Sequence, residues 1–537
     1  MDKQTLSNYG WLVIVTLILA IMLALATPFG TYVGDGVVSI SNGFVGTANS
    51  ATNEDSIDQS TVEWGIKADH GIDYKTYKYF DNIHNAMENK NESNKLKNDT
   101  VVIAYAEDKT PIIRFIRSCE INSPITVNGD LIIDTNDCNI ILTNETGFVL
   151  NNSSSLTIIG SGTIIHKSSS ENRLTTIDAT NTTSSSINLI KTNFVSNTTA
   201  SGNYFINTFS GDAIGTCNVK IEDCNIDITS IDESLYGIRI SEYSTLDMKN
   251  TKINTSTNKG FSLSVYSKGN MTAKNCEINA NSSGDSTYIA YNSSGNLILN
   301  DCKMSMINKD GVSNGVFNYN GYMELNNCST YLENTNFLST DWEFYAAISN
   351  SGTNAITNIN GGSCKMIAKY GSDTTVCVSN VGGEVNINGG SYYSNNINTI
   401  EANTEGGDME ADNFSYTIQT QDTTGISNVK NAIIVAEGTN SQVTPFRIQN
   451  GATVNIEGCT ITAKCTRTLE PLIQNNKDIF SYIYDCCIFL NAKIRDNTVN
   501  ISNSSLNGTF AFNTNKQNQY IGENVQFNVS DTYKEIS

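Results

Sequence analysis

Apolar and polar residues alternate along most of this chain in a short phrase that recurs at nearly constant spacing. Each copy reads apolar, polar, apolar, polar, then Asn, Asp or Gly, then a small residue, a polar residue and an apolar residue. In five successive copies the small position is residue 224, 251, 276, 302 and 328, so the spacings are 27, 25, 26 and 26 residues. Self-similarity at a fixed period of roughly 20–50 residues is typical of repeat architectures, in which each unit stacks on the next.

The residue before the small position indicates a bend. It is Asn, Asp or Gly in ten copies, and these residue types tolerate a positive φ. A left-handed residue between two short alternating runs predicts a one-residue bend that joins two strands. Five such residues should stack in one ladder, namely Asp223, Asn250, Asn275, Asp301 and Asn327. Later copies place Gly361, Gly389, Asn413, Gly458 and Asn503 at the same position.

A further alternating run precedes the phrase in many copies and ends in a turn. One example is Phe261, Leu263 and Val265, followed by Gly269. Each copy therefore predicts three strands in about 26 residues, which is one coil of a parallel β-solenoid. The coil is too long for a left-handed hexapeptide helix, so the chain is expected to form an all-β, right-handed parallel β-helix of about 14 or 15 coils. Weaker copies fall at Leu156–Ser161, Ile187–Thr192, Met409–Phe414 and Tyr482–Cys487, and another is expected around Ile433–Val435.

The solenoid is predicted over 125–537, with an N-terminal cap over 74–124. Tyr79, Phe80, Ile83 and Met87 fall at helical spacing, so the cap is expected to contain an amphipathic helix that covers the open end. Exposed strand edges at the end of a solenoid need such a cover.

The N-terminus carries a different pattern. Residues 11–26 are apolar except for Thr16, behind a head containing Lys3, and no other basic residue occurs before Lys67. This asymmetry predicts a cytoplasmic N-terminus and an extracytoplasmic remainder. Residues 1–29 are favoured as a retained hydrophobic helix that anchors the protein in the membrane, with 30–73 as a stalk. The alternative is cleavage after Ala26, at an Ala-x-Ala site, and secretion.

Charge excludes some functions. The chain has 33 basic and 54 acidic residues, a formal net charge of −21. Binding to nucleic acid is not expected, because no basic stripe is available to neutralise phosphates. No cofactor is expected, although the acidic balance leaves weak Ca²⁺ binding open.

Thirteen cysteines are present, an odd number. Cys276, Cys302 and Cys328 share one position in consecutive coils, and Thr251 takes the same position in another coil. Parallel Cβ directions fit disulfide geometry poorly, so these residues are expected to be buried free thiols. No Cys-x-x-Cys pair or neighbouring His suggests zinc.

Residues 111–116 (Pro-Ile-Ile-Arg-Phe-Ile) and 123–134 (Ser-Pro-Ile-Thr-Val-Asn-Gly-Asp-Leu-Ile-Ile-Asp) resemble the opening coils of pectate-lyase-like surface proteins of Gram-positive bacteria. Together with the recurring phrase, the resemblance covers most of the chain. It implies the fold and a location on the cell surface, and says little about activity.

Enzymes of this fold class need a recognisable set of catalytic residues. The lyases use an acidic calcium cluster with an Arg or Lys base, and the hydrolases use paired Asp residues with a His and an Arg-x-Lys. None of the three histidines has such a context, and no Asp pair or Arg-x-Lys occurs. Arg239 and Glu242 are only weak catalytic candidates, because charges on strands are usually solvated. An enzyme is therefore not favoured.

The longest insertion is the better candidate for a ligand site. The step from residue 328 to 362 is about 8 residues longer than its neighbours, and the excess must emerge as a loop. Asp341, Trp342, Glu343 and Tyr345 lie there and combine a flat apolar face with hydrogen-bonding groups. Tyr392 and Tyr393 form a second aromatic candidate. The competing interpretation is that these aromatic residues pack back on the solenoid.

The combined expectation is a membrane-tethered extracytoplasmic rod that acts in surface display or adhesion and binds cell-surface or host glycans. Two alternatives stay open. One is a polysaccharide lyase or glycoside hydrolase with a diverged site, and the other is a structural spacer. An exposed aromatic strip would favour glycan binding, and an acidic groove with converging Arg and Asp would favour the enzyme.

Overall fold

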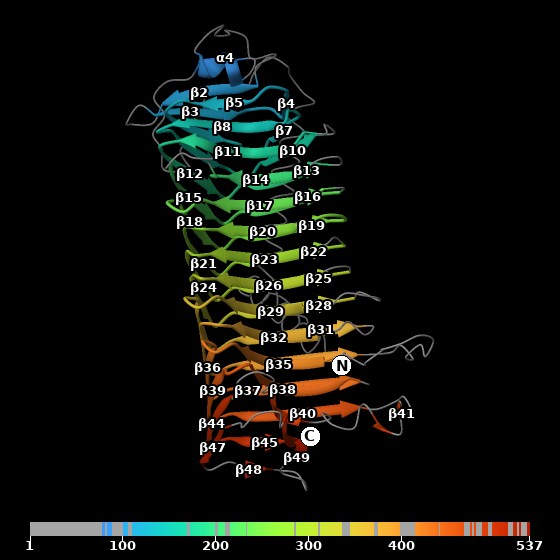
Figure 1. Ribbon diagram of the computed structural model, residues 1–537. Helices are drawn as coiled ribbons and strands as arrows, with labels where there is room; N and C mark the ends of the chain where they lie inside the picture. The colour runs from blue at the N-terminus through green and yellow to red at the C-terminus, as the bar shows by residue number, and fades with distance from the viewer. Residues whose placement is uncertain are drawn as a thin grey trace, which may run out of the picture. The chain divides into compact units, whose positions relative to one another are not determined.

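The computed structural model of the chain is a parallel β-solenoid built from three long sheets, which we call sheets A, B and C (Figure 1). The chain passes from a strand of sheet C to one of sheet A, then to one of sheet B, and returns to sheet C in the next coil. The all-β class and the parallel solenoid predicted from the sequence are confirmed.

The structure describes twenty-one segments of the chain. They are 78–80, 83–88, 100–105, 110–168, 172–198, 202–209, 215–231, 233–283, 286–309, 312–335, 344–369, 374–397, 414–439, 441–466, 473–474, 477–478, 486–491, 497–513, 519–523, 526–527 and 534–536. All belong to one compact unit, and the other unit, Met1–Ile72 with Ser93–Asp99, lies outside them.

Within the described segments, sheet A holds 17 strands, and sheets B and C hold 15 each. Sheet A consists of β1 (Lys78–Phe80), β2 (Val101–Tyr105), β3 (Pro111–Phe115), β6 (Asp130–Asp134), β9 (Ser155–Ile159), β12 (Ser184–Ile190), β15 (Thr216–Glu222), β18 (Thr245–Lys249), β21 (Asn270–Lys274), β24 (Asn296–Asn300), β27 (Tyr322–Asn326), β30 (Ile356–Asn360), β33 (Glu384–Asn388), β36 (Ile426–Lys430), β39 (Thr453–Glu457), β44 (Thr498–Ser502) and β47 (Gln519–Glu523). Sheet B consists of β4 (Cys119–Ile121), β7 (Asn139–Leu142), β10 (Thr163–Ser168), β13 (Asn193–Thr198), β16 (Asn225–Ser230), β19 (Lys252–Thr257), β22 (Glu277–Ser282), β25 (Lys303–Asn308), β28 (Ser329–Asn334), β31 (Ser363–Lys369), β34 (Ser391–Ile397), β37 (Ile433–Thr439), β40 (Thr460–Thr466), β45 (Ser505–Asn507) and β48 (Gln526–Phe527). Sheet C consists of β5 (Ile125–Val127), β8 (Thr146–Asn152), β11 (Leu174–Thr182), β14 (Asn203–Asn207), β17 (Leu235–Ile240), β20 (Ser262–Ser267), β23 (Ser286–Ser293), β26 (Val312–Tyr319), β29 (Phe344–Ser351), β32 (Thr374–Val381), β35 (Phe414–Gln421), β38 (Gln442–Gln449), β43 (Cys486–Asn491), β46 (Thr509–Asn513) and β49 (Lys534–Ile536). A separate antiparallel pair joins β41 (Ile473–Gln474) to β42 (Lys477–Asp478).

The N-terminal end of the solenoid departs from the parallel pattern. Strands β1, β2 and β3 pair antiparallel, and β3 then pairs parallel with β6. One short helix, α4 (Ile83–Met87), packs here, with Ile83 and Ala86 buried in the same core as Ile103. The expected amphipathic helix is thus shorter than predicted, because Tyr79 and Phe80 lie on strand β1 rather than on a helix. The cap as a whole is described only in part.

The predicted bend ladder is confirmed. Asp223, Asn250, Asn275, Asp301 and Asn327 have φ values of 55°, 49°, 53°, 53° and 50°. Their backbone N–H groups continue the interstrand ladder; for example, the Asn327 N–H donates to the Asn360 carbonyl at 2.8 Å. Gly361 and Gly389 take the same position with φ of 69° and 77°. The bend therefore keeps its backbone hydrogen bonds while it joins sheet A to sheet B.

The small residue after the bend has a specific bonding role. Its side chain donates to the carbonyl two residues earlier: the Cys302 Sγ lies 3.3 Å from the Asn300 oxygen, and the Thr251 Oγ1 lies 3.0 Å from the Lys249 oxygen. Ser504 makes the same contact with Ser502 at 2.8 Å. Cys, Thr and Ser are thus interchangeable here, because each is small and can donate to that carbonyl.

The stacked cysteines are buried and free of disulfides, as predicted. Hydrogen bonding to Cys302, together with burial, raises the pKa of both Cys276 and Cys328 well above the usual thiol range. The thiols of Cys276 and Cys328 therefore stay protonated at neutral pH, which predicts low reactivity of these two residues in the folded protein.

A buried asparagine ladder was not anticipated from the sequence. Asn292, Asn318, Asn350 and Asn380 lie near the ends of successive sheet C strands, and each is at most 1% exposed. Each amide donates to the next: Asn292 to Asn318 at 2.8 Å, Asn318 to Asn350 at 3.0 Å, and Asn350 to Asn380 at 3.0 Å. The same amides also donate to backbone carbonyls at the turns into sheet A, so the ladder fixes those turns.

Two weak copies of the phrase were assigned to the wrong strands. Phe414 begins β35 and Cys487 lies on β43, and both strands belong to sheet C, so neither residue follows a bend into sheet B. The additional copy around Ile433–Val435 is confirmed, since Asn431 has φ of 53° and precedes β37. Alternating runs occur in all three sheets, so alternation alone does not reveal which sheet a strand joins.

The predicted anchor over 1–29 and the stalk over 30–73 lie outside the described residues, as does Asn413. In the described segments, no helix is long and apolar enough to cross a membrane.

Candidate functional site

In sheet C the side chains along a strand do not alternate strictly between the inner and the outer face. In its central strands two successive residues turn inward, for example Gly237 with Ile238 in β17 and Ile289 with Ala290 in β23. The residues on either side of each pair face outward. Each coil therefore presents two outward positions, such as Tyr236 with Arg239.

Parallel pairing aligns these outward positions into rows. Tyr236 is in register with Leu263, which is in register with Tyr288. In the second row Arg239, Tyr266, Tyr291 and Phe317 follow one another across β17, β20, β23 and β26. Neighbouring parallel strands lie about 4.8 Å apart, so rings in one row must contact each other.

Eight rings form a continuous patch on this face, which we call the aromatic strip. It comprises Tyr204, Phe209, Tyr236, Phe261, Tyr266, Tyr288, Tyr291 and Phe317. Neighbouring ring centroids are between 4.8 Å (Tyr291 to Phe317) and 5.9 Å (Tyr288 to Phe317) apart. The strip spans β14, β17, β20, β23 and β26, which follow one another along one face of the solenoid (Figure 1).

The strip offers flat faces and hydroxyl groups together. All its rings except Tyr204 are half-buried, so part of each faces solvent. The hydroxyls of Tyr236, Tyr266 and Tyr291 have no hydrogen-bond partner within the described residues. Burial raises the pKa of Tyr291 to about 12, and it also raises that of Tyr236, so both phenols are neutral at neutral pH and can donate as well as accept.

Arg239 lies at one end of the strip and not in a catalytic pair. Its guanidinium carbon is 4.4 Å from the Phe209 ring centroid and 5.1 Å from that of Tyr236, and its Nη1 donates to the Tyr204 hydroxyl at 3.4 Å. No ion pair joins Arg239 to Glu242, and the Glu242 side chain is exposed. The two weak catalytic candidates therefore do not form an interacting pair in the described structure.

The residues predicted to bind ligand are dispersed. Asp341, Trp342 and Glu343 lie outside the described residues, and their role stays a prediction. Tyr345 is on β29, paired with Thr375 of β32. Tyr392 points into the core and is only 1% exposed, so it offers no surface to a ligand. Adjacent strand residues face opposite sides, and only Tyr393 lies on the outer face.

Tyr393 belongs to a second, smaller cluster on sheet B. The Lys365 Nζ lies between two rings, 5.5 Å from the centroid of Tyr393 and 6.0 Å from that of Tyr331. Both phenols already donate to carboxylates, Tyr393 to Glu437 at 2.7 Å and Tyr331 to Glu333. The cluster satisfies its own polar groups, so it is a weaker candidate for a ligand site than the aromatic strip.

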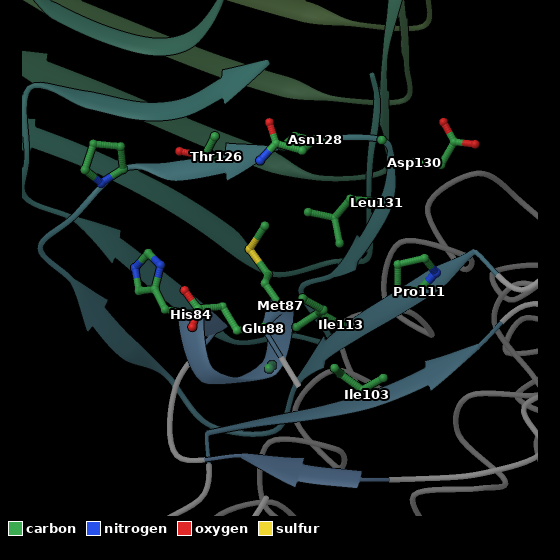
Figure 2. Close-up of a pocket in the computed structure, with 14 residues that line it drawn as sticks. His84, Met87, Glu88, Ile103, Pro111, Ile113, Thr126, Asn128, Asp130 and Leu131 are labelled. Carbon is green, nitrogen blue, oxygen red and sulfur yellow. The ribbon is translucent and has the colours of Figure 1, made fainter. Parts of the chain in front are cut away.

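A cavity of about 470 Å³ lies at the N-terminal end, between α4 and the first coils (Figure 2). Met87 and Leu131 project into it, whereas the carboxylate of Asp130 points away (Figure 2). His84 on its rim is hydrogen-bonded to the Ser123 hydroxyl at 2.8 Å. Polar and apolar groups line the cavity in similar measure, and its described residues show no arrangement suited to catalysis.

The described histidines do not form a catalytic site. His166 is fully buried, with its Nδ1 3.0 Å from the Thr176 hydroxyl and its Nε2 2.8 Å from the Asn144 carbonyl. Burial lowers the pKa of His166 to about 4. Nowhere in the described segments do three or more His, Cys, Asp or Glu side chains converge as they would to hold a metal ion.

Aromatic positions recur at the repeat spacing in the sequence, at residues 266, 291 and 317, and this signal was present but not used. Comparison of the chain with protein-family models, with curated proteins and with solved structures gave no match. Its function must therefore be inferred from the fold and from the surface that the fold presents.

Proposed function

We propose that this protein is a carbohydrate-binding β-solenoid that acts outside the cytoplasmic membrane in surface display or adhesion. The observation that carries the proposal is the aromatic strip, a row of contacting, half-buried rings on five consecutive coils with free phenol hydroxyls beside them. Sugar rings present one apolar face and many hydroxyls, and flat aromatic surfaces with nearby donors and acceptors complement both features.

The strip runs along the stacking direction of the coils. Successive coils repeat about every 4.8 Å, so one ring per coil gives a row of evenly spaced contacts. An extended oligosaccharide would then gain one stacking contact per coil, and affinity would grow with its length.

The finer features expected from the sequence belong to the same proposal. A right-handed coil and a pectate-lyase-like ancestry would place the protein among surface proteins of Gram-positive bacteria. The apolar segment Trp11–Ala26 would hold the solenoid at the membrane, or direct its secretion after cleavage. An insertion loop containing Trp342 would extend the binding surface.

A glycan panel tests the proposal. The full-length chain should bind a subset of glycans without generating new reducing ends. Tyr291→Ala should weaken binding about tenfold or more, because it removes the ring that contacts Tyr266, Tyr288 and Phe317.

Tyr322→Ala is the matched control, since Tyr322 is a half-buried tyrosine on sheet A that donates to Glu324 at 2.6 Å. It should leave binding unchanged. Equal effects of the two substitutions, or no binding across the panel, would refute the assignment. New reducing ends would favour the enzyme alternative.

A further inference from the structure

Three cations gather at one end of the aromatic strip, and we call Arg173, Arg239 and Lys268 the cationic end. Two guanidinium groups approach the same ring: their carbons lie 4.6 Å (Arg173) and 5.2 Å (Arg239) from the Tyr204 centroid. The Lys268 Nζ is 5.7 Å from the centroid of Phe209, which Arg239 also contacts. All three positive groups are thus concentrated around Tyr204 and Phe209.

None of these cations forms an ion pair with a carboxylate of the described residues. Elsewhere on the solenoid, lysines do pair, as Lys249 does with Glu222 at 2.7 Å and Lys252 with Glu277 at 2.8 Å. The whole chain has 54 acidic against 33 basic residues, so carboxylates are abundant. An uncompensated cluster of positive charge is unusual in such a chain.

Arg239 shows the lack of compensation most clearly. Among the described residues, its buried Nε has no hydrogen-bond partner, and its Nη1 donates to the Tyr204 hydroxyl. Two guanidinium groups around one ring also repel each other. An anionic group bound there would satisfy open donors and reduce that repulsion, and a guanidinium donates to a carboxylate or sulfate in a bidentate geometry.

The opposite end of the strip has no such feature. The ring contacts of Tyr288, Tyr291 and Phe317 are with one another and with other rings of the strip, and no described cation lies over them. A ligand with a negative charge on every sugar unit would place anionic groups over these rings, where no described positive side chain lies nearby. Those anionic groups would lose water of hydration without gaining an ion pair, which would disfavour binding.

We propose that the ligand of the aromatic strip is a mainly uncharged oligosaccharide that ends in a single acidic sugar. The acidic group, a carboxylate or a sulfate, binds at Arg173, Arg239 and Lys268, and the neutral sugars stack along Tyr266, Tyr291 and Phe317. This inference rests on the proposed carbohydrate-binding function, and it defines both the class of ligand and its orientation on the strip.

The test uses the full-length chain and a glycan array that presents each backbone in four forms. These are a neutral form, a form ending in a sialic acid, a form ending in a sulfated sugar, and a uniformly carboxylated chain such as an oligogalacturonate. One or both of the terminally acidic forms should bind about tenfold or more tightly than the neutral form, with a preference that decreases as salt increases.

Arg239→Gln should weaken binding of the terminally acidic forms about tenfold more than binding of the neutral form, so that the preference for the acidic terminus is lost. Arg447→Gln is the matched control, because Arg447 lies over Tyr416 at 4.8 Å on the same face of sheet C but away from the strip. Unfolding midpoints for both variants show whether either substitution has disturbed the fold.

Neutral binding that Tyr291→Ala weakens, with no preference for an acidic terminus, would overturn this inference and leave the proposed function standing. Strongest binding of the uniformly carboxylated chain would also overturn it. No binding of any form would overturn both.

Discussion

At Asn327, as at the four bends that precede it, the backbone turns through a left-handed residue with φ near 50°. An L-residue with a Cβ is disfavoured there by about 1–2 kcal/mol. The Asn327 side-chain amide donates to the Asp301 carboxylate of the preceding coil at 2.9 Å, which joins one bend to the next. Gly361, at the next bend, has no Cβ and avoids this penalty. The next residue, Gly362, must also be glycine, because a Cβ at Gly362 would lie 2.1 Å from the Cys328 oxygen. Residue type therefore predicts where most coils bend, whereas Lys191 takes the same conformation, with φ of 53°, without being Asn, Asp or Gly.

Buried polar side chains are less predictable from the sequence. The ring of His166 replaces an apolar residue on the inner face of β10, and it is tolerated because both of its nitrogens have partners. Nothing in the residues adjacent to it in sequence specifies these partners, since Thr176 lies on β11 and Asn144 lies between β7 and β8.

The first prediction concerns His166 and acid. The pKa is about 4 in the folded protein and about 6.5 in the unfolded chain. As the pH falls from about 6.5 to 4, the unfolded chain takes up a proton that the folded protein does not, so stability decreases over this window by about 3 kcal/mol and no further below it. The His166→Gln variant should lack this component.

The measurement is chemical denaturation of both proteins at several pH values. The stability advantage of the unsubstituted protein over His166→Gln should shrink between pH 6.5 and 4. A constant difference across that range would show that the imidazole is not held neutral by burial.

At the scale of strands and sheets, the asparagine ladder illustrates how a parallel stack uses polar residues. Because coils are in register, one side chain type repeated at one position can bond to its own copy above and below. Asn358, Asn386 and Asn428 do this on the outer face of sheet A, at 3.0 Å and 2.8 Å. The inner ladder makes equivalent bonds without access to water.

The second prediction compares the two ladders. Asn318→Ala should destabilise the protein by about 2–4 kcal/mol, because it removes the Asn318 bonds to Asn350 and to the Gly321 carbonyl and leaves buried polar groups without partners. Asn358→Ala on the outer ladder should change stability by less than about 1 kcal/mol, since water can replace its bonds. Denaturant titration of both variants measures the difference, and similar losses would contradict the role assigned to burial.

Element by element, the sequence predicts sheets A and B better than sheet C. The phrase with its bend identifies β18 with β19 or β27 with β28 directly, because the Asn, Asp or Gly marks their junction. Left-handed residues such as Asn320 and Asn450 follow strands of sheet C as well, but inward pairs such as Gly315 and Val316 interrupt the alternation within these strands. If side chains are assumed to alternate strictly, those on one side of each inward pair are therefore assigned to the wrong face of the sheet.

The aromatic strip was missed for this reason. The outward direction of Tyr291 and Phe317 follows from the inward pairs beside them, and their contact follows from the register of β23 with β26. Tyr392 shows the converse error: one of two adjacent tyrosines had to face inward, and the sequence did not indicate which.

At the scale of the whole solenoid, each coil contacts chiefly the coils before and after it. Stability in such an assembly is approximately a sum of coil terms and nearest-neighbour terms, so damage should stay local. Ion pairs such as that of Lys249 with Glu222 follow the same principle, because they join one coil to the next. They also neutralise some of the negative charge of a chain with a formal net charge of −21.

The last prediction tests this locality at Leu299, which is fully buried on β24 and in register with Ala273 of β21 and Leu325 of β27. Leu299→Ala should lower the stability of this region by about 2–5 kcal/mol, because it removes core contacts and leaves a cavity. Hydrogen–deuterium exchange should then accelerate in β21, β24 and β27 and change little in β9 or β39. Ile298→Ala is the control, since its half-buried side chain is the outward neighbour on the same strand and should have a small effect. Equal acceleration along every strand would instead show that the solenoid unfolds as one cooperative unit, in which a binding surface on five coils depends on all the others.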